Sequence, residues 1–365
     1  MKIALLAGAG ASTGVSREKF PTTAGFYEQY VDKSKLRDQP LFSILDDYVR
    51  REKLRQLKAS GQPIDEPLVV DIEEILFAAR ELRDVYSQFQ STSNSVARFA
   101  AFHEKIQSYG SYGNNATGLF ESTVPQIDGL VRQINELVHR AYVARPSKDE
   151  LGTTWIPLLR QLDSSANRMD VFTTNYDLVL EAAVRYAEVA VSAGNSDGVT
   201  QSLSLDAWTA PYQRASNLKG LLTKLHGSLH WLKGDDDEIE LTGSSFKNHE
   251  RQVALYPGYK GIPSESPYNL FHDYFANRIA ESEVVIVIGF AFRDDYINSL
   301  LQRHLTQLHR LLVIDPRASE VTVPGNANVE RCNLRFGNPD VGKVVQAFLL
   351  DKPLPQFVSR AGITL

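Results

Sequence analysis

Cysteine is almost absent from this chain, which has a single one, Cys332, among its 365 residues. One cysteine cannot close a disulfide within the chain, and it cannot supply the four thiolates of a cysteine-based zinc ribbon. Disulfides are formed and kept in oxidising compartments, so this usage favours a reducing environment. We therefore expect a cytoplasmic protein that holds no structural zinc.

Long apolar runs are missing as well. A membrane-spanning helix needs roughly 20 consecutive apolar residues, and the longest apolar run, 284–292, reads as a buried strand. Residues 1–7 have a superficial likeness to a signal peptide, with one positive charge before a short apolar stretch. Because that stretch runs directly into glycines, we interpret it as a strand and a turn, and we expect no membrane contact.

The chain has no excess of positive charge. Lysine and arginine number 39 against 44 acidic residues, which gives a formal net charge of -5. Surfaces that hold a nucleic-acid backbone are usually basic, so direct nucleic-acid binding is not predicted, although a local basic groove stays possible. The length and the 43% hydrophobic content allow one large domain with an insertion, or two domains.

What the sequence does contain is clean strand–helix alternation in its last third. This pattern predicts right-handed crossovers and an α/β fold, a Rossmann-like, doubly wound parallel sheet. A strand, a tight turn and a second strand are expected over 221–231, and the acidic run 235–238 reads as a solvated hairpin tip. The other expected strands are 2–7, 170–173, 284–288, 311–314 and 329–336, with helices after Asp177 through Val189 and over 295–309 and 341–350.

The middle of the chain has helical periodicity instead. Residues 71–80 place Ile72, Ile75, Leu76 and Ala79 on one helix face, with Asp71 as the N-cap. The same periodicity recurs over 99–106 and 127–143. We interpret 25–165 as a large helical insertion module, and 1–24 with 166–365 as one catalytic Rossmann domain.

A glycine turn, Gly8-Ala9-Gly10-Ala11-Ser12, follows the first expected strand. Glycines let backbone N–H groups approach a pyrophosphate without a Cβ in the way. The usual third glycine of a dinucleotide turn is absent at Thr13. A nucleotide-binding turn and a merely tight turn both remain open on this motif alone.

Two further motifs follow strands. In Thr173-Thr174-Asn175-Tyr176-Asp177, polar side chains stand where an open α/β sheet binds its ligands, although Asn175 or Asp177 could simply cap the next helix. His226 stands beside Gly227, and an imidazole there suits proton transfer near neutral pH, although a structural histidine is the alternative. His230 is the second-ranked histidine.

The last two motifs are strand ends in the final third. Gly289 ends a buried strand and could bring the backbone close to a ligand, while Asp294 or Asp295 could cap the following helix. Asp315 follows another strand and could accept hydrogen bonds from ribose hydroxyls, although an Asp-Pro turn is an equal alternative.

The order of these motifs resembles the sirtuin catalytic domain. It is most similar to the zinc-less, NAD-hydrolysing sirtuin-like branch of bacterial antiphage systems, whose motifs read TTNYD, LHGS followed by Trp, and IGxSFxDxxIN. Here these motifs are residues 173–177, 225–228 with Trp231, and 288–298. The resemblance covers the first 15 residues and most of 168–345; the block between them has no counterpart in deacetylase sirtuins.

The resemblance implies a role for each motif residue. Asn175 would orient the nicotinamide ribose or the attacking water, and Asp177 would hold that loop and the nicotinamide pocket. His226 would be the general base. The implied NAD-binding residues are Gly8, Ala9, Gly10 and Ser12 at the phosphates, Thr174, Gly289 on the adenosine side, and Asp315 at the adenine ribose.

The implied function is that of an NAD glycohydrolase, a gated antiphage effector that depletes NAD and uses no metal. The missing zinc module, and the absence of a GIPDFR-like segment at 13–21, disfavour peptide deacetylation. The alternatives are a sirtuin-like deacylase or ADP-ribosyltransferase, a non-catalytic module that binds NAD or ADP-ribose, and an ordinary Rossmann oxidoreductase. The family further implies a homo-oligomer and a separate partner, such as a HerA-type ATPase or a short Argonaute.

Overall fold

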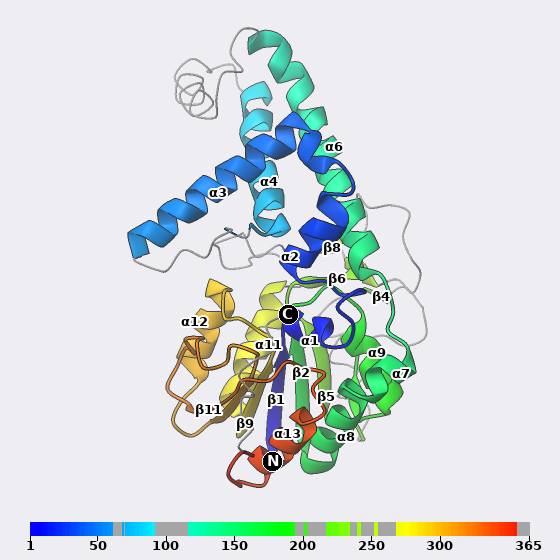
Figure 1. The fold of residues 1–365 in the computed structure, drawn as a ribbon, viewed down its shortest axis with the longest axis vertical. Coiled ribbons are helices and arrows are strands. Elements are labelled where there is room, and N and C mark those ends of the chain that lie inside the picture. Colours follow the sequence, from blue (N-terminus) through cyan, green and yellow to red (C-terminus); the bar gives the residue numbers. More distant parts are fainter. Residues whose placement is uncertain are drawn as a thin grey trace, which may run out of the picture.

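The chain forms a sheet with flanking helices, and a second group of helices stands over one edge of that sheet (Figure 1). In the computed structural model this edge is the one at which the parallel strands end. The second group lies in the connection between β1 and β2. The structure describes residues 1–60, 68, 70–91, 116–193, 201–202, 217–233, 239–241, 252–254 and 268–355.

The main sheet has seven parallel strands, in the order β11-β10-β9-β1-β2-β5-β3. β9 is apolar throughout, and β1 and β10 are apolar after a charged first residue, as expected for parallel strands that are covered on both faces. β2 differs, because it carries Arg168 and Asp170. The expected strands 2–7 and 284–288 are confirmed with the same bounds. The seven strands are β1 (Lys2–Ala7), β2 (Arg168–Thr173), β3 (Val191–Ser192), β5 (Gly220–Lys224), β9 (Val284–Ile288), β10 (Arg310–Ile314) and β11 (Asn328–Cys332).

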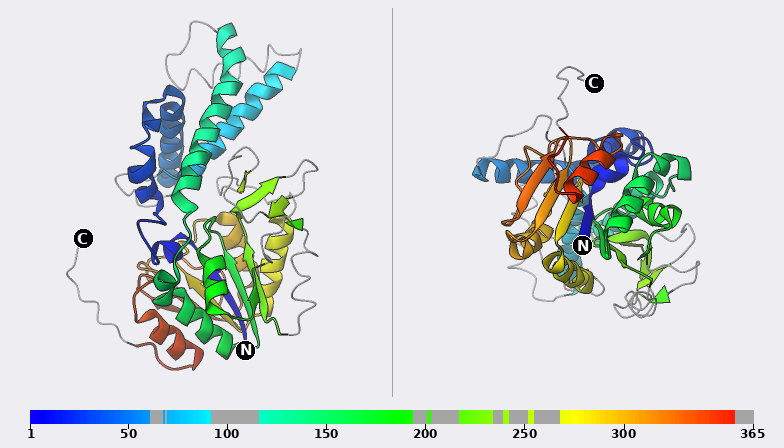
Figure 2. Two further views of the ribbon diagram at one scale, coloured as in Figure 1. Left: turned by 90° about the vertical axis from the view of Figure 1, so that its right-hand side faces the viewer. Right: turned by 90° about the horizontal axis from the view of Figure 1, so that it is seen from below.

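Helices cover both faces of this sheet (Figure 2). In β1, Ile3, Leu5 and Ala7 join one apolar core, and Ala4 and Leu6 join the core of the opposite face. The doubly wound α/β fold is therefore confirmed. The first core includes α1 (Ala9–Thr13), α7 (Lys148–Gly152), α8 (Trp155–Ser165), α9 (Val179–Ala187) and α13 (Val341–Leu349), and the second includes α11 (Tyr268–Glu281) and α12 (Asp295–His304).

A smaller antiparallel sheet lies beside the main one, in the order β4-β7-β6-β8. The expected strand–turn–strand over 221–231 is present as β5, a tight turn and β6, but the two strands belong to different sheets. The acidic run 235–238 lies outside the described residues. The strands are β4 (Gln201–Ser202), β6 (Gly227–Lys233), β7 (Ile239–Leu241) and β8 (Gln252–Ala254).

The helical insertion has an apolar core of its own. Its longest helices are amphipathic and pack their apolar faces on one another. Asp71 caps α4 as expected: its Oδ1 accepts the N–H of Glu73 at 3.1 Å, and Glu74 Oε2 accepts the N–H of Asp71 at 2.8 Å. The expected helix 99–106 lies outside the described residues. The elements are α2 (Thr23–Phe26), η1 (Tyr27–Val31), η2 (Leu36–Asp38), α3 (Pro40–Ser60), α4 (Ile72–Ser91) and α6 (Ala116–Tyr142).

The last helices of the predicted insertion pack on the main sheet, and the predicted domain boundary at residue 165 stays a prediction. Helices α7 and α8 fall within the predicted module, yet Trp155 and Leu159 are fully buried in the core of the main sheet. Their apolar faces pack there because they form the last part of the connection that enters β2. No helix among the described residues is both long and apolar enough to cross a membrane.

Candidate active site

The predicted site residues gather at the carboxyl ends of the central strands. The chain leaves β1 toward β2 on one side and returns through β9 on the other, so β1 stands at the switch point of the strand order. Open α/β sheets bind their ligands at such a point. The residues that follow the strands are Gly8 after β1, Thr174, Asn175 and Asp177 after β2, His226 after β5, Gly289 after β9 and Asp315 after β10.

The side-chain amide of Asn175 is fixed by two hydrogen bonds. Its Nδ2 donates to the carbonyl oxygen of Gly8 and to Ser12 Oγ, both at 2.9 Å. The backbone N–H of Asn175 donates to Thr173 Oγ1 at 3.0 Å. Both amide hydrogens are used, so this side chain can act on a substrate only through its oxygen, as an acceptor.

Asp177 is buried in the same network. Its Oδ1 accepts the N–H of Val179 at 2.9 Å, and its carboxyl also accepts a hydrogen bond from the Ser12 hydroxyl. Burial raises the pKa of Asp177, although the positive charge of Lys224 and the bond from Ser12 oppose that rise. Ser12 therefore connects Asn175 to Asp177, and its predicted contact with the NAD phosphates stays a prediction.

Lys224, the last residue of β5, was not singled out from the sequence. Its side chain is almost fully buried, and its ammonium donates to the backbone carbonyls of Tyr176 and Asp177. The third partner is Glu181 Oε1 at 2.8 Å. These bonds use the three donors of the ammonium group. The strand that leads to His226 thus holds the loop that carries Asn175.

His226 lies in the turn after β5 and pairs with a carboxylate. Its Nε2 is 2.8 Å from Asp294 Oδ2, and both side chains are largely buried. Asp294 also caps α12, since its Oδ1 accepts the N–H of Ile297 at 2.8 Å. Burial tends to raise the pKa of Asp294, but the hydrogen bond and the charge of His226 outweigh it, and the pKa falls below its usual value.

This pairing decides the chemistry of the histidine. A carboxylate only accepts, so Nε2 carries a proton and Nδ1 of neutral His226 has the lone pair. The ring of His272 lies 6.4 Å away, centroid to centroid. Burial lowers the pKa of His272 to about 4, so this second ring is neutral at physiological pH. The sequence indicated Asp294 as a helix cap only, and the side chain of His230 lies outside the described residues.

The glycines bring two strand ends into direct backbone contact. The N–H of Gly8 donates to the carbonyl of Ile288, and the N–H of Gly10 donates to that of Gly289, both at 3.0 Å. A Cβ added to Gly8 would lie 2.6 Å from the Gly289 oxygen, closer than any real contact. The tight-turn alternative therefore explains these glycines, and the contacts of Gly8 and Gly10 with the NAD phosphates and of Gly289 with the adenosine side stay predictions.

Gly289 should tolerate no side chain. It has a φ of +60°, and an added Cβ would lie 2.3 Å from the backbone nitrogen of Ala11. We expect Gly289→Ala to lower the free energy of unfolding by about 2 kcal/mol, measured by urea titration. Gly152→Ala is the control, because nothing lies within 4 Å of its added Cβ. Equal midpoints for the two variants would contradict the packing role.

The remaining predicted residues lie at the same edge without forming a defined pocket with the others. Ala9 is exposed, and Thr174 is half-buried. Asp315 Oδ1 accepts the N–H of Arg317 at 2.9 Å, which is the turn-forming alternative. Contacts of these three residues with NAD stay predictions.

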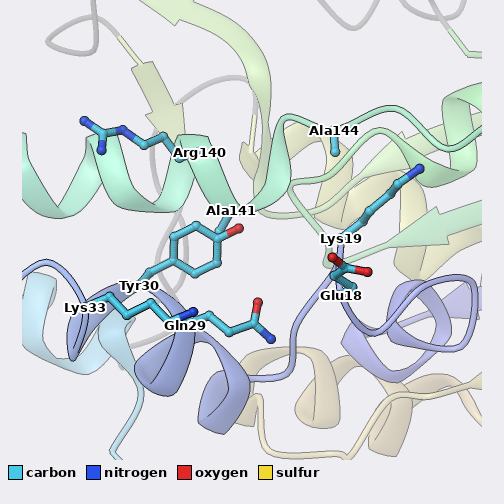
Figure 3. Close-up of a pocket in the computed structure, with 8 residues that line it drawn as sticks. All are labelled: Glu18, Lys19, Gln29, Tyr30, Lys33, Arg140, Ala141 and Ala144. Atoms are coloured by element: carbon cyan, nitrogen blue, oxygen red, sulfur yellow. The ribbon is translucent and has the colours of Figure 1, made fainter.

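A surface cavity of about 430 Å³ lies elsewhere, where the chain enters and leaves the insertion. Figure 3 shows Tyr30 pointing toward Ala141 of α6, with Gln29 and Lys33 beside it. None of its lining residues is a predicted site residue, so the cavity is not the candidate active site. Across the described ranges, no cluster of His, Cys, Asp or Glu has the arrangement of a metal site.

Comparisons with known proteins found one matching family and several similar solved structures. A comparison with curated proteins found no match. Among solved structures, a Sir2 homologue in complex with NAD has a TM-score of 0.41 and 13% identity, covering 95% of this chain and 90% of that one. A Sir2 homologue variant in complex with ADP-ribose has a TM-score of 0.40 and 10% identity, covering 96% and 92%. Residues 170–333, which include Asn175, Asp177 and His226, match the family described as SIR2-like domain.

Proposed function

We propose that this chain is an NAD glycohydrolase, which cleaves the nicotinamide–ribose bond of NAD to give nicotinamide and ADP-ribose. The observation that supports it best is the pair of His226 and Asp294, at the same sheet edge as the fixed amide of Asn175. The SIR2-like domain implies NAD binding, and these residues lie within that domain.

The proposed reaction needs few protein groups. Nicotinamide leaves as a neutral molecule, because the pyridinium nitrogen takes the electron pair of the broken C–N bond. Water then adds to the oxocarbenium-like ribosyl carbon and loses a proton, which His226 accepts. Asn175 would accept a hydrogen bond from the water or a ribose hydroxyl, and Asp177 would hold the loop. The proton is released to solvent after product leaves.

Two alternatives make different predictions. A deacylase or ADP-ribosyltransferase would consume NAD only when an acyl or protein acceptor is present. A binding module would bind NAD or ADP-ribose without turnover, and substitution of His226 would leave its output intact. The single cysteine disfavours the first, since no four-cysteine zinc module can form.

The test is nicotinamide release from NAD by the purified chain without an acyl peptide, with Asn175→Ala beside the wild type. We expect release by the wild type and a loss of at least about 100-fold in the variant, because the amide oxygen that positions the reactants is gone. NAD that is bound but stays intact for hours in the wild type would leave a binding module or a gated enzyme that awaits its partner, and repeating the assay with the product of the neighbouring gene added would separate these two.

We further propose that the activity is gated, since a free NAD hydrolase would poison its own cell. The insertion stands over the strand ends and is the part of the chain best placed to block or release the site (Figure 1). Homo-oligomerisation, a partner such as a HerA-type ATPase or a short Argonaute, and a role in antiphage defence belong to this proposal. A monomeric mass at micromolar concentration, with and without NAD, would remove the oligomer from it.

A further inference from the structure

The helical insertion contacts the catalytic loop at Tyr176, between Asn175 and Asp177. Tyr176 is only 9% exposed, and with Leu229 it belongs to the apolar core of the insertion. It does not pack into either core of the main sheet. The position of this loop therefore depends on side chains from both parts of the chain.

Glu73, in the first turn of α4, carries this contact into the polar network. Its carboxyl accepts a hydrogen bond from the side chain of Tyr176. The neighbouring Glu74 has other partners, since it binds the N–H of Asp71 and forms an ion pair with Lys53 at 2.9 Å. Two adjacent acids of one helical turn thus have separate tasks, and only one of them reaches the catalytic loop.

The same loop is held from the opposite side by the sheet. The carbonyl oxygen of Tyr176 accepts from Lys224 Nζ at 3.1 Å and from the N–H of Leu229 at 3.2 Å. The backbone of Tyr176 is thus anchored to the strands that flank His226, and its side chain is anchored to the insertion. Loss of either anchor leaves the loop with partners on one side only.

We propose that Glu73 is a positioning residue of the active site, which acts through Tyr176 to set the place of Asn175 and Asp177. This inference rests on the proposed NAD hydrolysis for its kinetic consequences. The insertion then contributes directly to the geometry of the active site, because a shift of α4 would move the loop that carries Asn175.

The surroundings of Glu73 favour its neutral form. Burial, and then the charge of Asp71, raise the pKa of Glu73 well above its usual range, and Asp294 and Glu74 act in the same direction. Tyr142 is close enough to Glu73, Asp71 and Asp177 for these acids to raise its own pKa, after burial. A neutral carboxyl accepts from Tyr176 much as a side-chain amide does. Glutamine at this position should therefore preserve the contact, whereas alanine removes it.

The kinetic test compares kcat and KM for NAD in four single variants and one double variant. Glu73→Ala and Tyr176→Phe should each lower kcat about five- to tenfold, the effect of one lost hydrogen bond, with KM within about twofold of the wild type. Glu73→Gln should keep most of kcat, and Glu74→Ala should behave as the wild type. The double variant Glu73→Ala/Tyr176→Phe should lower kcat no more than either single substitution, because both remove the same hydrogen bond.

A second measurement does not need turnover. Hydrogen exchange of the backbone amides in 174–179 should be about five- to tenfold faster in Glu73→Ala than in the wild type, and unchanged in Glu74→Ala. If the wild type released no nicotinamide while this difference appeared, the positioning role would stand without support for the proposed reaction. Equal exchange in Glu73→Ala and the wild type, or equal kcat losses in Glu73→Ala and Glu74→Ala, would overturn the role of Glu73.

Discussion

His226→Gln is expected to slow nicotinamide release by about 10²- to 10⁴-fold, the usual contribution of a general base. Glutamine keeps an N–H donor for the carboxylate of Asp294, which lies 2.8 Å from the imidazole in the native chain. It cannot take a proton from water. The fold should therefore persist while the rate falls, as measured by single-turnover release of nicotinamide with far-UV circular dichroism as the check on folding.

Asp294→Asn should give a smaller loss, about 10- to 100-fold. Asparagine is a good N-cap, so the start of α12 should survive, but the negative charge that stabilises a protonated His226 is lost. His304→Gln, on the same helix, is the control and should keep the wild-type rate. A His226→Gln variant with full activity would mean that another group accepts the proton.

The central strands β1, β9 and β10 were predictable because parallel strands covered on both faces are continuously apolar; the two-residue strand β3 was not predicted. The run 284–288 is such a strand, and its neighbours in the sheet are the strands expected at 2–7 and 311–314. The polar residues at their carboxyl ends could be expected to gather, because parallel strands end at one edge. This reasoning brought Asn175, Asp177 and His226 to one place.

Pairings made by tertiary structure were not predictable. Asp294 has the pattern of a helix cap, and only the folded chain brings its second oxygen to His226. Lys224 reads as part of an apolar strand, and its buried position follows from the loop after β2. The packing of α8 on the sheet was missed because its apolar face gives no sign of which core it joins.

Lys224→Met is expected to destabilise the protein by about 3–5 kcal/mol, the range for removing one partner of a buried ion pair. Three acceptors lose their donor at once: the carbonyls of Tyr176 and Asp177 and the carboxylate of Glu181. Methionine replaces the volume of the aliphatic chain, so the loss reflects the missing hydrogen bonds rather than a cavity. Urea unfolding monitored by tryptophan fluorescence measures it.

Lys219→Met is the matched control, because Lys219 immediately precedes the first residue of the same strand. Its ammonium binds the carbonyl and the carboxylate of Asp163, but the side chain of Lys219 is 30% exposed. Water can replace the ammonium there, so the expected loss is about 1 kcal/mol or less. A similar loss of unfolding free energy in both variants would show that the ion pair of Lys224 contributes no more than a surface ion pair. A large loss in Lys224→Met alone, with a lower kcat in the fraction that stays folded, would identify the ammonium as the anchor of the loop that carries Asn175, since it donates to both carbonyls of that loop.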